Sequence, residues 1–240
     1  MSALARDDRA PNLLVGEDVR IAQDAQLGAN VVIHAGARVG PGVIVQDGAV
    51  LGKLPVLGER SSSSREAPPP LVIERGAVIC TGAVVFAGAQ IGEHAIIGDQ
   101  SHVRERATVG ERAVVGRGCA IGPGARIGAR VRLQTMVWIT GGAVVEEDAF
   151  VGPGVMTMND NQMGRRSRTE PLDPPRLRRA CRVGGGVLIT PGVEVGEEAF
   201  VASGAVLTSD VPARAKIRGV PGRAFGEVDD GELLERWHHS

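Results

Sequence analysis

The sequence predicts an all-β solenoid in which six-residue repeats wind into about eight triangular coils. An aliphatic residue returns every six residues through 25 repeats, and small residues fill a second position of the same repeat. The chain has 34 Gly, four Phe, two Trp and no Tyr. Its core must therefore be filled by small aliphatic side chains rather than by the aromatic residues that anchor most layered domains.

The repeats fall into three runs, which cover residues 15–50, 73–156 and 183–212. Position one of the hexad is Ile, Leu or Val in every repeat, and position five is Ala or Val in 23, with Ser101 and Cys119 as the exceptions. Position four is Gly, Asn or Asp in 18 repeats, and these residues best tolerate the left-handed backbone of a corner. An amphipathic helix would instead space its apolar residues three and four apart.

The hexad pattern also predicts how each coil closes. Alternate residues of a strand share a face, so positions one and five should point inward. Three hexads then supply three short strands and three corners, and each coil pairs with the next at about 4.8 Å.

Two segments interrupt the repeats, and both are predicted to be loops. Residues 51–72 are rich in Ser and Pro, and residues 157–182 are rich in Arg. Long loops on a regular scaffold are often functional. We expect one β-helix domain over 1–222 that carries loops 51–72 and 157–182. The tail, 223–240, is expected to form a short helix that caps the open end of the core.

Charge and cysteine content narrow the class of protein. Lys and Arg total 27, Asp and Glu total 28, and the formal net charge is −1, which argues against a nucleic-acid partner. Three Cys are too few for a disulfide framework and favour a reducing compartment. Residues 1–11 lack the apolar run of a signal peptide, and no long apolar stretch follows. We expect a cytoplasmic protein that does not bind a membrane.

The hexads resemble those of the hexapeptide-repeat acyltransferases, whose fold is the left-handed parallel β-helix. Segments 98–110, 133–141 and 152–165 look like parts of bacterial nucleotide-sugar N-acetyltransferases. The most specific part is the run Asn159-Asp160-x-x-Met163-Gly164-Arg165. RGVPGR at 218–223 resembles the closing motif G-x-P-A-[RK], with Gly where Ala is usual.

This resemblance implies an activity and an assembly. It implies transfer of an acetyl group from acetyl-CoA to the amino group of an amino-deoxy sugar carried on UDP or dTDP. It also implies a homotrimer whose sites lie between neighbouring helices.

The coil length places the resembling residues. Asn159 falls 18 residues after Gly141, and Asp160 falls 18 after Gly142, so each pair is predicted to stack at one corner. Small corners beside Asn159 and Asp160 would leave a surface for the pantetheine arm of acetyl-CoA.

Acyl transfer to an amine needs a donor for the oxyanion and a group that takes the amine proton. Asn159 is the candidate to orient the amine or serve the oxyanion, and Asp160 is the candidate to hold the amine or accept its proton. Relatives with a His base place it at a corner like the one occupied here by Gly141 and Gly142. His102 is the alternative base. A structural interpretation also stays open, because Asn and Asp favour turns of this kind.

Other residues are candidates for binding the nucleotide sugar or coenzyme A. The guanidinium of Arg suits a diphosphate. Trp138 is predicted to point outward, two coils above His102, where a base could stack on its ring. The candidate substrate-binding residues are Arg104, Glu105, Gln134, Trp138, Met163, Gly164 and Arg165. The candidate coenzyme A-binding residues are Gly141, Gly142, Lys216, Arg218 and Arg223. Solvated charges are the alternative interpretation of the last three, which follow the final repeat.

No metal is expected, because His94 and His102 lack the spacing of the zinc-binding γ-carbonic anhydrases that share this fold. Two other functions remain open. One is a hexapeptide acyltransferase whose acceptor is a sugar hydroxyl or an amino acid, and the other is a non-catalytic scaffold. Binding of acetyl-CoA would separate the enzymes from the scaffold.

Overall fold

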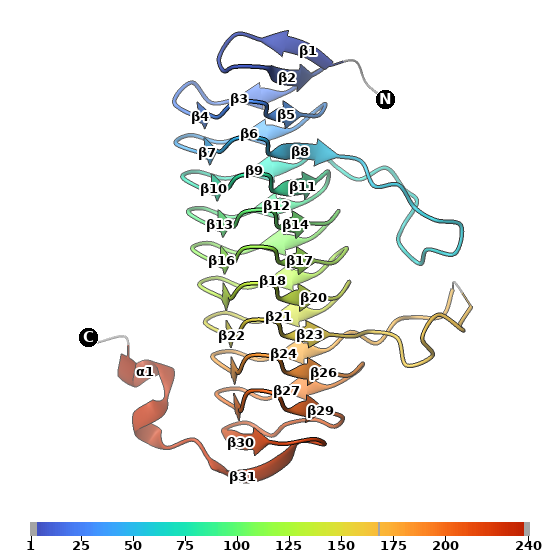
Figure 1. Cartoon of the computed structure of the whole chain (residues 1–240), viewed down its shortest axis with the longest axis vertical. Coiled ribbons are helices and arrows are strands. Elements are labelled where there is room, and N and C mark those ends of the chain that lie inside the picture. Colours follow the sequence, from blue (N-terminus) through green and yellow to red (C-terminus); the bar gives the residue numbers. More distant parts are fainter. Residues whose placement is uncertain (1–3, 168, 238–240) are drawn as a thin grey trace.

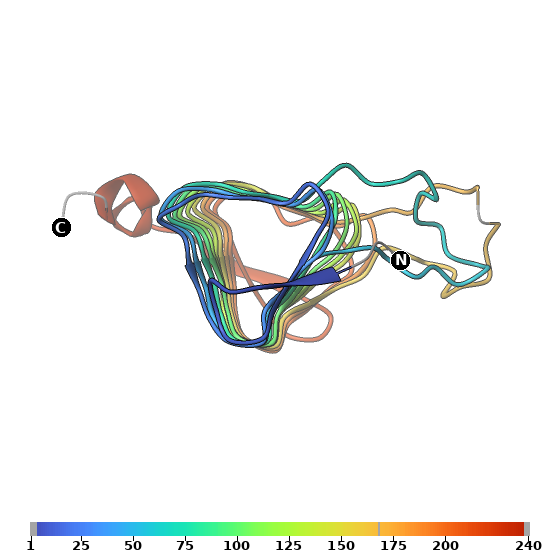
Figure 2. The ribbon, with the colours of Figure 1, turned by 90° about the horizontal axis from the view of Figure 1, so that it is seen from above.

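The computed structural model describes residues 4–167 and 169–237 and shows a left-handed parallel β-helix (Figure 1). Seen along its axis, the coil has a triangular outline (Figure 2). Equivalent residues of consecutive coils pair 18 positions apart, as Val78 with Ile96 and His102 with Ala120 show. The predicted fold class is confirmed.

Three sheets form the sides of the triangle. In spatial order, sheet A contains β1 (Leu4–Asp7), β2 (Leu13–Gly16), β5 (Val32–Ile33), β8 (Val50–Lys53), β11 (Val84–Phe86), β14 (His102–Val103), β17 (Ala120–Ile121), β20 (Trp138–Ile139), β23 (Met156–Thr157), β26 (Leu188–Ile189) and β29 (Val206–Leu207). Sheet B contains β3 (Arg20–Ile21), β6 (Arg38–Val39), β9 (Val72–Ile73), β12 (Gln90–Ile91), β15 (Thr108–Val109), β18 (Arg126–Ile127), β21 (Val144–Val145), β24 (Arg176–Leu177) and β27 (Glu194–Val195). Sheet C contains β4 (Gln26–Leu27), β7 (Ile44–Val45), β10 (Val78–Ile79), β13 (Ile96–Ile97), β16 (Val114–Val115), β19 (Arg132–Leu133), β22 (Phe150–Val151), β25 (Arg182–Val183), β28 (Phe200–Val201), β30 (Ala215–Arg218) and β31 (Arg223–Glu227).

The coil is longer than predicted. Within residues 4–167 and 169–237, the three sheets contain 11, 11 and 9 strands, so the prediction of about eight coils was too low. One reason is that hexads beside the two interruptions belong to the coil. At the two ends, β1 pairs antiparallel with β2 and β31 pairs antiparallel with β30, which adds a strand to sheet A and another to sheet C.

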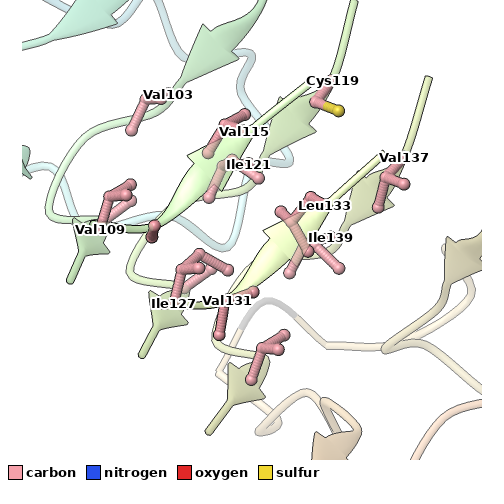
Figure 3. Packing of buried hydrophobic residues seen from close by; sticks show 14 of the residues in the cluster. Val103, Val109, Val115, Cys119, Ile121, Ile127, Val131, Leu133, Val137 and Ile139 are labelled. Carbon is pink, nitrogen blue, oxygen red and sulfur yellow. The ribbon is translucent and has the colours of Figure 1, made fainter. Parts of the chain in front are cut away.

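The two inward positions of the hexad are buried, as predicted. Ile121 at position one and Ala125 at position five are both fully buried, and the neighbouring coils repeat the arrangement. Figure 3 shows the resulting columns, in which aliphatic side chains of successive coils stack on one another. Each core position has fixed neighbours in the coils above and below. The packing of this core is therefore sensitive to small changes in side-chain volume.

The two exceptions at position five form hydrogen bonds inside the core. Ser101 Oγ donates to Gly116 O at 2.8 Å and accepts from Cys119 N at 3.1 Å, and Cys119 Sγ donates to Gln134 O at 2.9 Å. Each polar atom that replaces an aliphatic group therefore has a backbone partner, as burial requires.

Position four adopts a positive φ even where the residue is not Gly, Asn or Asp. Within the 25 predicted hexads, the seven such residues have φ between 52° and 62° and are His94, Gln100, Arg106, Arg112, Arg130, Met136 and Glu198. The stacked coils thus impose the corner conformation on side chains that disfavour it.

Both interruptions are shorter than the hexads indicate. Leu51, Leu71 and Leu177 are fully buried core residues, and the fully buried Cys181 fills position five of the hexad that Leu177 begins. The loops therefore extend over 54–70 and 158–175. Both project from the same side of the coil, opposite α1 (Figures 1 and 2).

The helical part of the tail does not cap the core as expected. The hairpin of β30 and β31 closes the end of the coil, while the 3₁₀ helix η1 (Asp230–Glu232) and the short helix α1 (Leu234–Trp237) lie beside the coil (Figure 1). Ion pairs of Arg179 with Glu235 and of Lys216 with Glu232 hold the tail there. Residues 238–240, which the expected tail includes, lie outside the described residues.

None of the helices in the described parts of the chain is long and apolar enough to span a membrane.

Candidate functional site

The two loops leave the coil at one corner, between sheets A and B. The first connects β8 to β9 and the second connects β23 to β24. They contact each other where Arg60 Nη2 donates to Gly164 O at 3.4 Å. The first loop is also tied to the coil, because Arg106 Nη2 donates to Glu66 O at 2.8 Å.

A cleft of about 720 Å³ lies between these loops and the coil. Its inner wall is formed by successive coils and its outer wall by both loops. The lining residues are Ser62, Ser63, Ser64, His102, Arg104, Glu105, Arg106, Ala120, Ile121, Gly122, Pro123, Gly124, Trp138, Thr140, Gly141, Gly142, Asn159, Asp160, Leu172 and Pro174. The size suits an extended small molecule.

The floor of the cleft requires glycine where the coils touch. A Cβ atom on Gly122 would lie 2.3 Å from the backbone N of Gly141, which is closer than any real contact. Gly142 has a φ of +77°, and a Cβ there would press on Pro174 of the second loop. The bare corner predicted from Gly141 and Gly142 is therefore present, and the returning second loop packs against it.

Asn159 stacks on this corner as the 18-residue spacing predicts. Its Nδ2 donates to Gly141 O at 2.9 Å, and its backbone O accepts from Asp173 N at 2.9 Å. The side-chain bond fixes the plane of the amide. An amide has two N–H donors and an acceptor oxygen, so a single bond leaves capacity for a ligand.

Asp160 organises the start of the second loop. Oδ1 accepts from Gln162 N at 2.9 Å and Oδ2 accepts from Gly164 N at 2.8 Å. The backbone N–H groups of Gly164 and Gln162 hold the pKa of this carboxyl below its ordinary value, and Arg166 adds to the effect. Asp160 is therefore ionised at neutral pH, and a lowered pKa makes it a weak proton acceptor.

Glu105 and Arg104 form an ion pair at the opposite end of the cleft. Glu105 is 1% exposed, and its two oxygens accept from Arg104 Nε at 2.7 Å and Nη2 at 3.0 Å. The Arg104 guanidinium also lies 5.0 Å from the centre of the Phe86 ring. The pair thus forms a fixed wall of the cleft, and each oxygen of Glu105 already accepts one hydrogen bond from Arg104.

Trp138 and His102 share an outward column of sheet A, with Ala120 between them. Trp138 is 49% exposed and borders the cleft. The register puts His102 three coils from Met156, which begins the strand that leads to Asn159. At about 4.8 Å per coil this is roughly 14 Å. His102 and Asn159 therefore lie at two ends of the cleft and cannot both contact one reacting atom.

The remaining predicted site residues are not brought into the cleft lining. Gln134 follows β19 of sheet C, and Met163 and Arg165 are exposed on the second loop. Gly164 borders a separate cavity between the loops.

The three basic residues predicted for coenzyme A lie at the far end of the coil. Lys216 pairs with Asp229 and Glu232 of the tail, which neutralise it. Arg218 lies 4.8 Å from the Phe225 ring centre, and Arg223 donates to Gly222 O.

Sequence reasoning missed the outer wall of the cleft. Ser62, Ser63 and Ser64 of the first loop and Leu172 and Pro174 of the second loop line it. The run of four Ser at 61–64 was the only signal, and it indicated an exposed loop rather than a wall.

Among the described residues, no group of three or more His, Cys, Asp or Glu side chains is placed to hold a metal ion.

Two models of repeat families match parts of the chain. They are described as bacterial transferase hexapeptide (six repeats), over residues 15–53, and hexapeptide repeat of succinyl-transferase, over residues 177–209. Both matched stretches carry hexapeptide repeats of the bacterial transferase type. The second match begins at Leu177, at the hexad that the sequence analysis assigned to a loop.

This hexapeptide-repeat protein is similar to curated acetyltransferases over short stretches. It is 34% identical over 64 residues to a 2,3,4,5-tetrahydropyridine-2,6-dicarboxylate N-acetyltransferase of Enterococcus faecalis, which covers 25% of this chain and 28% of the relative. The chain spans about a third or less of the length of such curated relatives.

Two solved structures share the fold over most of the chain. The LpxA UDP-N-acetylglucosamine acyltransferase of Bacteroides fragilis aligns with a TM-score of 0.55 at 15% identity, covering 87% of this hexapeptide-repeat protein and 72% of LpxA. The UDP-N-acetylglucosamine acyltransferase of Francisella novicida aligns with a TM-score of 0.53 at 19% identity, covering 96% and 68%. At these identities the likeness shows the fold.

Proposed function

We propose that the protein is an acyl-CoA-dependent acyltransferase that moves acetyl from acetyl-CoA to the amino group of a nucleotide-linked amino-deoxy sugar. The observation that carries the proposal is the cleft of about 720 Å³ in which an oriented amide, that of Asn159, lies over the bare Gly141-Gly142 corner. The hexapeptide repeats and the acetyltransferase relatives support the acyl transfer. The choice of acceptor rests on the resemblance of residues 159–165 to nucleotide-sugar N-acetyltransferases.

The reaction needs little from the protein besides positioning. The free amine attacks the thioester carbonyl, a C–N bond forms, and the C–S bond breaks as the tetrahedral intermediate collapses. The proton lost by the amine passes to the departing sulfur, so the products are the amide and free coenzyme A. Asn159 would hold the amine or donate to the oxyanion, a role that a fixed amide plane favours.

Asp160 would act through its charge rather than as a base. An ionised carboxylate beside the corner attracts an incoming ammonium group, and it holds the loop that covers the cleft. His102, roughly 14 Å away along the coil, would contact another part of the substrate. Trp138 lies between these ends on the same face and offers a surface for a ring to stack on.

A homotrimer is part of the proposal. From β2 to β29, the outward column of sheet A is apolar except for His102, and its members are Leu14, Val32, Val50, Val84, His102, Ala120, Trp138, Met156, Leu188 and Val206. Trp138 and Met156 are each 49% exposed. An apolar strip of this length supports packing against other copies of the chain.

The deciding experiment follows release of free coenzyme A from acetyl-CoA in the presence of UDP- and dTDP-linked amino sugars. The matched control substrates are the same nucleotide sugars with a hydroxyl in place of the amine. Turnover is expected with an amine only, and Asn159→Ala should suppress it while Gln90→Ala, an amide removed from an exposed strand outside the cleft, should not. Turnover of the hydroxyl sugars alone would contradict the proposed acceptor, and no binding of acetyl-CoA in a thermal-shift assay would contradict the enzyme.

A further inference from the structure

A second cavity, of about 550 Å³, lies between the two loops. Its lining residues are Glu59, Arg60, Ser62, Asp160, Gly164, Arg166, Ser167 and Leu172. Ser62, Asp160 and Leu172 also line the main cleft. The two spaces therefore adjoin, and a ligand that fills the main cleft could extend into the space between the loops.

Arg166 is half-buried in this cavity, with hydrogen-bonding capacity unused. Its side chain is 15% exposed, and its Nε and Nη1 have no hydrogen-bond partner among the described residues. The nearest carboxylate oxygen paired with it, Asp160 Oδ1, lies 3.4 Å from Nε and already accepts from Gln162 N. Burying unsatisfied guanidinium donors is costly, so this position favours a ligand that supplies acceptor oxygens.

Arg60 offers a second guanidinium to the same cavity from the opposite loop. Its Nη2 makes a single long bond, of 3.4 Å, to Gly164 O. A guanidinium has five N–H donors in a planar fork that matches the oxygens of a phosphate. Arg60 and Arg166, one on each loop, both line this cavity, so each can bind one phosphate of a diphosphate.

Glu59 is expected to limit the affinity of this cavity for anions. Glu59 and Asp160 balance Arg60 and Arg166 among the cavity residues. The charge of Asp160 is partly offset by Arg166, whose Nε lies 3.4 Å from Asp160 Oδ1, so Glu59 is the acid whose charge is expected to weaken anion binding most. The affinity of the cavity for phosphate should therefore rise when Glu59 loses its charge.

We propose that Arg60 and Arg166 form a phosphate-binding subsite between the loops, which takes the diphosphate of a ligand whose other end occupies the main cleft. The subsite stands on the loop geometry alone. Its assignment to the diphosphate of the acceptor nucleotide, rather than to coenzyme A, rests on the proposed function.

The first measurement is calorimetric titration of the full chain with inorganic pyrophosphate. Arg166→Gln and Arg60→Gln should each weaken binding roughly 10- to 100-fold, the scale of a lost charge-assisted hydrogen bond. Glu59→Gln should strengthen binding, and Arg166→Lys should keep part of it. Arg126→Gln is the matched control, because it removes the same charge from an exposed strand residue outside both cavities. Thermal unfolding of each variant checks that it is folded.

Two further titrations identify the source of the phosphate. UDP or dTDP should lose affinity in Arg166→Gln as pyrophosphate does, while coenzyme A should not. Parallel losses for coenzyme A alone would overturn the assignment to the acceptor. Pyrophosphate binding that is absent, or equal in wild type, Arg60→Gln and Arg166→Gln, would overturn the subsite itself. Neither result bears on release of coenzyme A from acetyl-CoA, so the proposed function is tested separately.

Discussion

Asn159 and Asp160 are neighbours of similar size at one corner, yet their hydrogen bonds give them different capacities. The Asn159 amide is fixed by one bond to Gly141 O, whereas both Asp160 oxygens accept backbone N–H groups of the second loop. The 18-residue spacing predicted where both residues lie. It could not predict the turn at Gln162 and Gly164 that engages Asp160, because that turn depends on the path of an irregular loop.

Asn159→Ala is therefore expected to lower kcat by roughly 10- to 1,000-fold, the scale of losing one donor to a developing oxyanion. The KM for acetyl-CoA should change less, because the glycine corner stays in place. Steady-state release of coenzyme A measures both constants, with Gln90→Ala as the control. A variant with unchanged kcat would remove Asn159 from the reaction.

His102→Ala should raise the KM for the acceptor more than it lowers kcat, because His102 lies at the other end of the cleft from Asn159. The measurement is the same assay at several pH values. A large loss of kcat, together with loss of the rising acid limb from the pH profile of the residual activity, would instead make His102 the base. The reacting centre would then lie beside Arg104.

At the scale of elements, the hexad pattern predicted the regular coils well and its own interruptions poorly. Thr157 occupies position one but is polar, and its Oγ1 accepts from Thr140 N at 2.8 Å and donates to Trp138 O at 3.1 Å. Hydrogen bonds thus hold a coil position that the apolar rule rejects. The hexad from Leu177 to Arg182 obeys the rule but adjoins the Arg-rich loop. It was assigned to that loop because of its Arg content, although the repeat pattern continues through it. The contact of the loops with each other has no signature in either segment.

The thiol of Cys181 tests whether that hexad belongs to the coil. Burial raises its pKa to about 12, and a raised pKa keeps the thiol protonated at pH 8, where it is a poor nucleophile. We expect a colorimetric thiol reagent to modify at most Cys80 rapidly in the folded protein, and all three Cys after unfolding in urea. Rapid modification of Cys181 in folded Cys80→Ser protein would show that residues 177–182 are loop.

Overpacking tests the columns of small side chains. Ala125→Leu or Ala143→Leu should lower the free energy of unfolding by about 1–3 kcal/mol, because a fully buried Ala has fixed neighbours in the coils above and below. Urea denaturation measures the change, and the exposed Ala213→Leu is the control. Equal stability of the core and control variants would contradict the assigned register.

At the scale of the whole molecule, two sides of the coil differ in the side chains that they expose to solvent. Arg20, Arg38 and Arg126 are exposed on sheet B, whereas Trp138 and Met156 are exposed on sheet A. In a solenoid each coil packs only against the coils next to it, so the coil itself does not cover an apolar outer face. The apolar side and the cleft both lie along sheet A, so a neighbouring copy on that face would also border the cleft.

We expect the protein to be a trimer in solution and Met156→Glu to shift it toward monomers, because a charge would be buried without a partner. Light scattering coupled to size-exclusion chromatography gives the mass, and Gln90→Glu on sheet B is the control. A wild-type protein that is strictly monomeric and fully active would falsify the shared face.

The two loops leave sheet A from β8 and β23, which are five strand positions apart in that sheet. At about 4.8 Å per position, their roots are separated by roughly 24 Å. The height of the opening is therefore a whole number of coils, and it can change only in steps of one coil. Removing a complete coil of 18 residues between the loops would shorten the opening by one step and leave the residues of both loops unchanged. The length of substrate that fits the opening is therefore set by the number of repeats between the loops rather than by side-chain substitution.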